Sequence, residues 1–259
     1  RVASYMTEVE TISRNTKWQL LNHLEPDFLL DYTHRIVLQN PDINGCVIAM
    51  EPYFFPEKGR GFSVYSVRFQ DSILTSRESK YNYYEKEWYK SVRESGQGVW
   101  INPFDDYKDG SLSSPDVITS YNDPIYTPDG QFVEVLSMGL SLQWLSKVLL
   151  RDKPYENAYC VMLGKEGKFL VHPDSTKLMN KTIFDDVDPL TQSDMIALGH
   201  EMMAQTSGYM QVNIDGEDCY VFYQPMGHTN WSIALVCSES DIFRRYNRLL
   251  FILLPLLGR

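Results

Sequence analysis

The same order of strand-like runs, turns and a helix occurs in both halves of the chain, and this repeat constrains the fold more than any other feature. In the first half, strands are predicted at 45–51, 61–68, 117–120, 125–126 and 132–142, with a helix at 83–95. In the second half, strands are predicted at 158–163, 168–172, 209–214, 218–224 and 231–237, with a helix at 194–204. The turns Thr127-Pro128-Asp129-Gly130 and Asp215-Gly216-Glu217 are typical of antiparallel hairpins. We therefore expect an α+β chain with two modules, each built on an antiparallel sheet.

A long amphipathic helix is predicted before the first module. Residues of one helix face recur every three or four positions, at Met6, Val9, Ile12, Thr16, Leu20 and Leu24. Pro26 interrupts this pattern, and a second helix is expected from about 27 to 39, ended by the turn Asn40-Pro41-Asp42. A short helix at 143–150 and a joint at 151–154 are expected to connect the two modules.

The last residues form an apolar run that follows three arginines. Residues 249–257 are apolar without interruption, and Arg244, Arg245 and Arg248 precede them. Nine residues are too few to cross a bilayer, which needs about 20. A C-terminal helix packed on the core is one interpretation, but the run has no polar residue to form an outer face. We expect the first half of a membrane-spanning helix, and because the chain also opens within a helix, we expect an extracytoplasmic domain between two spans.

Composition and motifs exclude several classes of function. A net charge of −10 disfavours nucleic-acid binding, which requires clustered basic residues. The four cysteines form no CxxC pair, so a structural zinc site is not expected. The sequence does not decide whether two of the three cysteines Cys160, Cys219 and Cys237 form a disulfide. The adjacent carboxylates Asp105-Asp106 and Asp185-Asp186 point to opposite faces of extended chain, and His172 lacks a second histidine at ligand spacing. No catalytic residues, metal or cofactor are therefore predicted.

Several local strings resemble the double-Cache family of bacterial extracytoplasmic sensors. They are Lys86-Glu87-Trp88-Tyr89, the stretch from Trp100 to Asp106, the stretch from Ile118 to Tyr126, the stretch from Lys168 to Asp174, and Trp231-Ser232-Ile233-Ala234. The resemblance covers nearly the whole chain and is strongest to the sensor regions of membrane-bound serine phosphatases of the sporulation-regulator type and of histidine kinases. It implies a long N-terminal helix followed by two PAS-like modules.

The resemblance also implies an assignment of the chain to five segments. They are the two N-terminal helices at 1–40, a membrane-distal ligand-binding module at 41–142, a linker helix at 143–154, a membrane-proximal module at 155–240, and the start of a second transmembrane helix at 241–259.

The resemblance places a ligand in the distal module. The implied ligand-binding residues are Lys86, Trp88, Tyr89, Phe104, Asp106, Tyr121 and Tyr126. On the helix at 83–95, Lys86 and Tyr89 are three residues apart and are expected to share a face as ligand donors, whereas Trp88 packs. The amino-acid-binding branch has an aspartate for the ligand amine where this chain has Gly139, which favours a small carboxylate or another polar metabolite over an ordinary amino acid.

The sequence therefore predicts a sensor domain without catalysis of its own. Ligand binding would shift a two-state equilibrium and move the terminal helices, so that a cytoplasmic phosphatase or kinase domain responds. The expected location is the inner membrane, with this segment periplasmic or extracellular and the membrane at both ends. A homodimer through the first helix is expected, and no nucleic-acid partner. Two alternatives stay open: a ligand-free dimerisation module of the same fold, and a secreted α+β enzyme.

Overall fold

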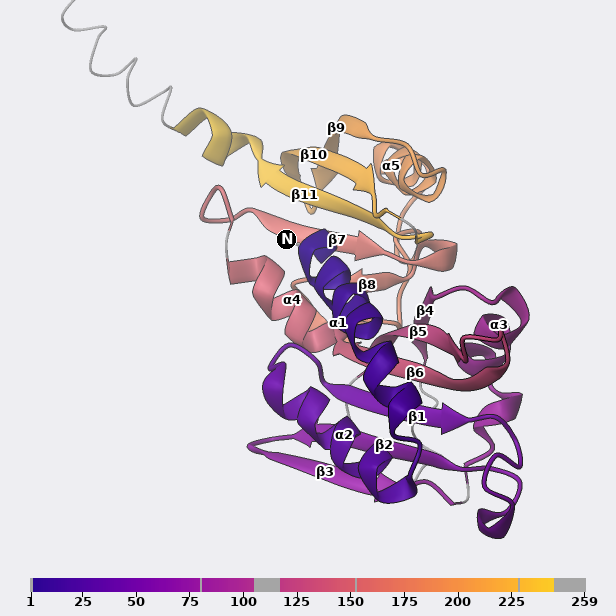
Figure 1. Cartoon of the computed structure of the whole chain (residues 1–259). Coiled ribbons are helices and arrows are strands. Elements are labelled where there is room, and N and C mark those ends of the chain that lie inside the picture. Colours follow the sequence, from indigo (N-terminus) through magenta and orange to yellow (C-terminus); the bar gives the residue numbers. More distant parts are fainter. Residues whose placement is uncertain (1, 80, 105–116, 152, 228, 245–259) are drawn as a thin grey trace, which may run out of the picture. The chain divides into compact units, whose positions relative to one another are not determined.

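The chain divides into two compact units. The computed structural model describes residues 2–79, 81–104, 117–151, 153–227 and 229–244, and in these ranges the side chains of Phe104 and Leu150 are left out. The units are Arg1–Leu142 and Gln143–Arg259 (Figure 1). Each contains one antiparallel sheet with helices packed on it, which confirms the predicted α+β class with two sheet modules.

The first unit is built on a six-stranded sheet in the order β3-β2-β1-β6-β5-β4. Its helices are α1 (Val2–Asn22), α2 (Pro26–Gln39) and α3 (Glu87–Ser95), with short 3-10 turns η1 (Pro56–Lys58) and η2 (Tyr83–Glu85). Its strands are β1 (Gly45–Met50), β2 (Ser63–Phe69), β3 (Ser72–Arg77), β4 (Val99–Phe104), β5 (Ile118–Tyr126) and β6 (Phe132–Ser141). All neighbouring strands pair antiparallel, as the hairpin turns in the sequence predict.

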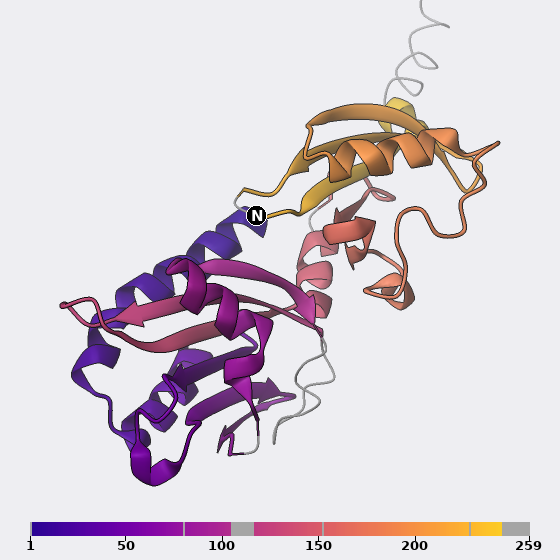
Figure 2. The same ribbon diagram turned by 90° about the vertical axis from the view of Figure 1, so that its right-hand side faces the viewer.

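The second unit has a five-stranded sheet in the order β8-β7-β11-β10-β9. Its elements are α4 (Leu142–Arg151), β7 (Tyr159–Leu163), η4 (Lys165–Gly167), β8 (Phe169–Val171), η5 (Ser175–Lys177), α5 (Ser193–Met203), β9 (Gly208–Ile214), β10 (Glu217–Pro225) and β11 (Ser232–Ser238). Figure 2 shows α5 lying along one face of this sheet. Its buried side chains, Leu198 and Met202, join the apolar core formed by the strands beneath it.

Three strands of the first unit differ from the sequence prediction. β3 and β4 were not predicted as strands, and β5 is one continuous strand rather than two short pieces. Pro124 interrupts the strand pattern in the sequence because proline lacks the N–H that a central strand needs. In the structure β4 begins at Val99, opposite Asn122, so that β5 is paired only with β6 at Pro124. A proline is therefore tolerated inside this strand.

The two faces of the six-stranded sheet are covered by different helices (Figures 1 and 2). α1 and α2 pack on one face, where Ile48 of β1, Leu136 of β6 and Ile125 of β5 belong to one apolar core. α3 packs on the other face, against a second core that includes Val47 and Val135. Successive residues of a strand point to opposite faces, so each strand contributes alternate residues to the two cores.

A buried carboxylate fixes α1 to the sheet. The Ser13 hydroxyl donates to Asp123 Oδ2 at 2.6 Å, and Lys17 Nζ lies 2.8 Å from Asp123 Oδ1. Ser13 is fully buried and Asp123 is 5% exposed. Val9 and Leu20 of the same helix face are buried in the adjoining apolar core. Polar and apolar contacts therefore hold the same face of α1 against its own unit.

The apolar face of α1 that was expected to form a dimer is mostly buried within the single chain. Of the apolar stripe predicted for dimerisation, Met6, Val9 and Leu20 are buried within the single chain and Ile12 is half-buried. Trp18, in contrast, is 63% exposed. A dimer through this helix would therefore use the face that includes Trp18 rather than the buried stripe.

Glu134 is a buried acid in the apolar core under α1 and α2. It lies on β6 opposite Met50 and Ile125 and is fully buried. Neither of its carboxyl oxygens has a hydrogen-bond partner in the part of the chain that the structure describes. Burial raises the pKa of Glu134 to about 8, because an apolar environment penalises the charged form.

The cysteines are not bridged, and the described chain ends before the apolar C-terminal run. All four cysteines are free thiols, so no pair among Cys160, Cys219 and Cys237 is bridged. The described chain ends in helical residues 239–244, and the apolar run predicted to enter the membrane lies outside the described residues. Among the described helices, none is long and apolar enough to cross a bilayer.

Replacing the buried anchor of α1 should destabilise the first unit. We expect Asp123→Ala to lower the free energy of unfolding by about 2–4 kcal/mol, because the buried Ser13 hydroxyl loses its acceptor and Lys17 its counter-ion. The control is Asp31→Ala, which removes an exposed ion pair with Arg35 and should cost less than about 0.5 kcal/mol. Urea unfolding measures both values, and equal losses would contradict the anchoring role of Asp123.

Glu134 should make the stability of the protein fall as the pH rises. Its pKa is about 8 in the folded protein, whereas an unfolded glutamate titrates near about 4.3, so the folded state binds the proton more tightly. This contribution is complete below about pH 4.3, is lost as the pH rises, and is gone above about pH 8. Between pH 5.5 and 8, wild type should lose on the order of 3 kcal/mol relative to Glu134→Gln, which has no charge to bury. Urea unfolding at several pH values tests this, and parallel profiles for the two proteins would refute it.

Candidate ligand-binding site

α3 covers its face of the six-stranded sheet with aromatic side chains. The helix begins after Lys86, whose backbone is extended, and ends at Gly96, which has a left-handed conformation with φ of 67°. Trp88, Tyr89 and Val92 are its buried residues. The Tyr89 ring packs edge-on against Tyr83, with ring centres 5.1 Å apart. The apolar side of this short helix is therefore fully used for packing.

Two tyrosine hydroxyls tie this aromatic layer to the end of β1. Tyr83 donates to the carbonyl oxygen of Met50 at 2.7 Å and accepts the backbone N–H of Phe62 at 2.9 Å. Tyr89 donates to the same Met50 oxygen at 3.2 Å. Burial raises the pKa of Tyr83 to about 12 and also raises the pKa of Tyr89, so both remain neutral donors. Arg93 Nε donates to Glu51 Oε2 at 2.9 Å beside them.

Lys86 and Trp88 both contact the side chain of Tyr81. The indole Nε1 of Trp88 donates to the Tyr81 hydroxyl at 3.1 Å. The ammonium of Lys86 lies 5.4 Å from the centre of the Tyr81 ring, within the range of a cation–π interaction. Lys86 is half-buried, whereas Trp88 is only 4% exposed. These three side chains form a cationic and aromatic group beside the start of α3.

The geometry expected for Lys86 and Tyr89 is wrong in one respect. The expectation placed both residues three apart on one helix face, but Lys86 precedes α3 and has φ of −84° and ψ of 146°. Helical spacing does not apply to such a residue. The Tyr89 hydroxyl is bonded to the β1 backbone, whereas Lys86 lies against Tyr81.

The sheet under α3 has a band of buried polar side chains, Ser120, Asn122 and Ser137. Ser120 and Asn122 alternate with residues of the opposite face, and Asn122 pairs with Ser137 across β5 and β6. All three are at most 3% exposed. Asn122 Nδ2 donates to Ser120 Oγ at 3.0 Å. Hydroxyl and amide groups thus lie on the sheet face that also carries the apolar side chains Val47 and Val135.

Gly139 extends this band along β6. A Cβ atom at Gly139 would lie only 2.5 Å from Ile118 Cγ2, so Ile118 already occupies the space of a side chain there. On the other side, Gly139 pairs with Gly45, where a Cβ would lie 3.2 Å from the Tyr65 hydroxyl oxygen. The packing therefore leaves no room for an aspartate side chain at this position.

The structure does not bring together all the predicted site residues. Tyr121 lies on the opposite face of the sheet, where it contacts Trp100 with ring centres 5.5 Å apart, and Trp100 donates to Glu10 of α1 at 2.8 Å. Tyr126 is on the α3 face but near the end of the helix, packed on Phe132. Phe104 is the last residue of β4, and Asp106 lies outside the described residues.

The residues that sequence reasoning missed are Tyr81 and the polar band. The alternation of β5 would have identified Ser120 and Asn122 as facing α3 once Tyr121 and Asp123 were assigned to the other face. Tyr81 lies outside any regular element, and no spacing in the sequence marks it as a partner of Trp88.

Comparison with known proteins identifies the family. The family model of the Cache domain, in its double-Cache form, matches residues 28–246. The chain belongs to the Cache family. This membership confirms the resemblance inferred from the local strings. A comparison with curated proteins found no match.

Solved structures with the same fold are extracellular sensor domains. The extracellular domain of the histidine-kinase candidate mmHK1S-Z3 is 17% identical, with a TM-score of 0.77 over 96% of this chain and 93% of that one. Methyl-accepting chemotaxis protein X is 18% identical, with a TM-score of 0.72 over 92% of each chain. The ligand-binding domain of the Pseudomonas fluorescens chemoreceptor CtaA, in complex with L-serine, is 17% identical, with a TM-score of 0.61 over 92% and 91%.

The family membership sets the general function of this segment. Cache domains of this kind are the extracellular ligand-sensing parts of histidine kinases and chemoreceptors. They are ligand-binding modules and are not themselves catalytic, so the alternative of a secreted enzyme is set aside.

Removing the two tyrosine hydroxyls under α3 should have unequal effects. Tyr83→Phe leaves the buried N–H of Phe62 without an acceptor and should lower the free energy of unfolding by about 1–3 kcal/mol. Tyr89→Phe should cost less than about 1 kcal/mol, because the Met50 oxygen keeps Tyr83 as a donor and Glu51 keeps Arg93. Urea unfolding of both variants measures the difference, and a larger loss for Tyr89→Phe would contradict this hydrogen-bond assignment.

Proposed function

We propose that this Cache domain senses a small polar solute with a carboxylate group, bound on the α3 face of its first unit. The observation that supports the proposal is the group formed by Lys86, Tyr81 and Trp88, on the same face of the sheet as the buried polar band. A ligand site typically combines apolar and aromatic walls with a few polar groups that fix the orientation of the ligand. The α3 face offers both kinds of group within one unit.

Lys86 is the residue that would select an anionic group. Its ammonium offers three donors and is half-buried against an aromatic ring, which weakens the competition from water. Trp88 would pack against the ligand or hold Tyr81 in place, since its indole N–H is bonded to the Tyr81 hydroxyl. Phe104, the last residue of β4, and Asp106, which follows it on the chain, remain proposed members of the site.

The solved relatives agree with a carboxylate ligand. The domain of CtaA was solved with L-serine, L-leucine and L-isoleucine, and that of Mlp24 with asparagine. All of these ligands have an α-carboxylate. At Gly139 this chain has no acidic side chain for an α-ammonium, because Ile118 fills that space. We therefore favour a carboxylate without a free α-amine, or another polar metabolite, over an ordinary amino acid.

β6 provides a route by which binding could reach the second unit. This strand contributes Ser137 to the polar band and ends at Ser141, and α4 begins at the next residue, Leu142. No loop separates strand and helix, so a shift of β6 along its axis would be passed to α4 rather than absorbed. We propose this connection as the first step of the relay to the cytoplasmic output domain.

The remaining parts of the proposal concern assembly and location. We propose that the segment lies on the periplasmic or extracellular side of the inner membrane, with a membrane span at each end. We also propose a homodimer through the exposed face of α1, where Trp18 is the large apolar side chain.

The ligand-binding proposal is tested by a thermal-shift screen of small carboxylates and amino acids. A ligand at 100 times its dissociation constant adds about 2.7 kcal/mol to stability. Lys86→Met and Asp106→Ala should each weaken the hit by about ten- to a hundredfold, because each removes a charged hydrogen bond. Isothermal titration with the hit measures the affinities.

Lys90→Met is the matched control. Lys90 is an exposed lysine of α3, four residues after Lys86, so its loss should leave affinity unchanged. Equal affinity of wild type and Lys86→Met would refute the assignment of the carboxylate to Lys86, and a screen without any hit would favour the ligand-free dimerisation module.

A further inference from the structure

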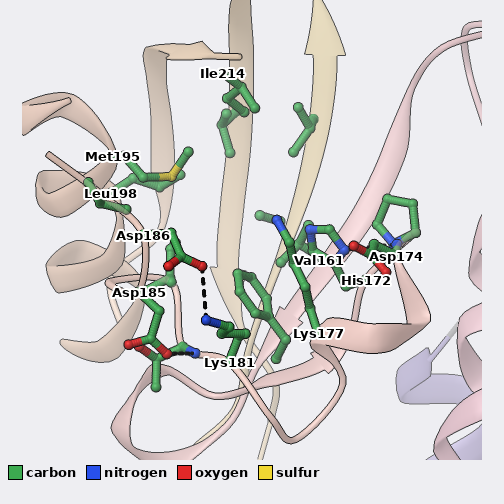
Figure 3. Close-up of a pocket in the computed structure, with 18 of the residues that line it drawn as sticks. Val161, His172, Asp174, Lys177, Lys181, Asp185, Asp186, Met195, Leu198 and Ile214 are labelled. Atoms are coloured by element: carbon green, nitrogen blue, oxygen red, sulfur yellow. Dashed lines mark hydrogen bonds and ion pairs between the residues drawn. The ribbon is translucent and has the colours of Figure 1, made fainter. Parts of the chain in front are cut away.

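The second unit contains a cavity that is independent of the site proposed above. Its volume is about 450 Å³, within the range of about 300–1,000 Å³ that is typical of small-molecule sites. It lies between one face of the five-stranded sheet and α5 (Figure 3). The space is open to solvent at its mouth and extends inward to the apolar core of the unit.

The inner wall of the cavity is apolar. Val161, Val221 and Ala234 line it from the sheet, and Met195, Leu198 and Met202 line it from α5. These side chains belong to the core of the unit, yet they do not close the space between them. An occupant would therefore present an apolar tail or ring to this wall.

Most charged groups at the mouth of the cavity are already bonded within the protein. Asp186 pairs with Lys181 at 3.0 Å, as the dashed line in Figure 3 shows. Asp185 accepts the backbone N–H of Thr182 at 2.7 Å. Asp174 accepts the backbone N–H and the hydroxyl of Thr176 at 2.9 and 2.6 Å. Asp215 also lines the mouth and is exposed to solvent, where water screens its charge.

Two hydrogen-bond donors at the mouth, on the side chains of Lys177 and His172, are not bonded to another group among the described residues. Lys177 is half-buried, and among the described residues no hydrogen bond or ion pair involves its side-chain ammonium; Figure 3 shows the side chain extended toward His172. The Nδ1 atom of His172 accepts the backbone N–H of Asp174 at 2.9 Å, which leaves the proton of the neutral ring on Nε2. Burial and the nearby Lys177 lower the pKa of His172, which keeps the ring neutral.

We propose that this cavity is a second ligand site, which binds a monocarboxylate with an apolar tail or ring. The ammonium of Lys177 and the Nε2–H of His172 would hold the carboxylate at the mouth, and the tail would fill the space between the sheet and α5. Both donors suit an anion and neither can accept a hydrogen bond from an ammonium group. The inference does not rest on the site at Lys86, which belongs to the other unit.

Three probes with the same phenyl tail test the head group. They are 3-phenylpropanoate, 3-phenylpropylamine and L-phenylalanine, added to the whole chain labelled with 13C in its methionine methyl groups. Met195 and Met202 line the cavity, whereas Met50 and Met138 lie in the core of the first unit and serve as internal references. Methionine-to-leucine variants assign the signals.

We expect 3-phenylpropanoate to shift the signals of Met195 and Met202 and to leave those of Met50 and Met138 unchanged. The amine should cause no shift, and phenylalanine should bind more weakly than phenylpropanoate because its α-ammonium, next to the carboxylate, would lie beside the ammonium of Lys177, which repels it. Lys177→Met should weaken phenylpropanoate binding about ten- to a hundredfold. Lys165→Met, which removes an exposed lysine of the same unit outside the cavity, should not change it.

Three results would overturn the proposal: no shift at Met195 and Met202 with phenylpropanoate, an equal response to the amine, or equal affinity of wild type and Lys177→Met. Lys86→Met separates the two sites, because it should bind phenylpropanoate at Met195 and Met202 as wild type does, whatever happens to binding in the first unit.

Discussion

The alternation of side chains along β5 and β6 is the constraint on which the first unit depends. Asp123 and Ile125 face α1 and α2, whereas Ser120 and Asn122 face α3. A shift of one residue in the register would exchange these faces, burying the polar band under α1 and turning Asp123 away from Ser13 and Lys17. The attachment of α1 and the candidate site are therefore fixed by the same strand register.

The fold could be predicted from the sequence because the features that indicate it involve residues close together in the chain. Hairpin turns and strand runs are short-range features, and they were enough to place two antiparallel modules after a long helix. β3 was missed because its residues, Ser72–Arg77, are mostly only half-buried and give little apolar signal. It is a strand because it pairs with β2 in a hairpin, with Phe69 opposite Ser72, and this backbone pairing does not require an apolar pattern in β3.

The faces on which the candidate site residues lie were predicted less well, for the same reason. Tyr121 was assigned to the pocket although a strand that continues through Pro124 places it with Asp123 on the α1 face. The face of a residue can be assigned only when the whole strand is known, and the proline had divided this strand in two. Likewise, the pairing of Lys86 with Tyr89 assumed a helix that in fact begins one residue after Lys86. Small errors at the ends of elements become large errors in the direction of side chains.

The energetics of signalling limit what either site can do alone. Moving a two-state receptor from 1:99 to 99:1 requires a ligand that binds one state about 10⁴-fold more tightly, or about 5.5 kcal/mol. One charged hydrogen bond, such as that offered by Lys86 or Lys177, supplies about 1.5–3 kcal/mol. A single such contact would suffice only if the unliganded states were already nearly balanced. Otherwise the ligand must also repack groups that differ between the states, and in the proposed relay such a change would pass from one unit into the other at the junction of β6 with α4 at Leu142. If both sites act on this junction, their ligands must affect each other's binding by the same factor, because coupling between two binding sites is reciprocal.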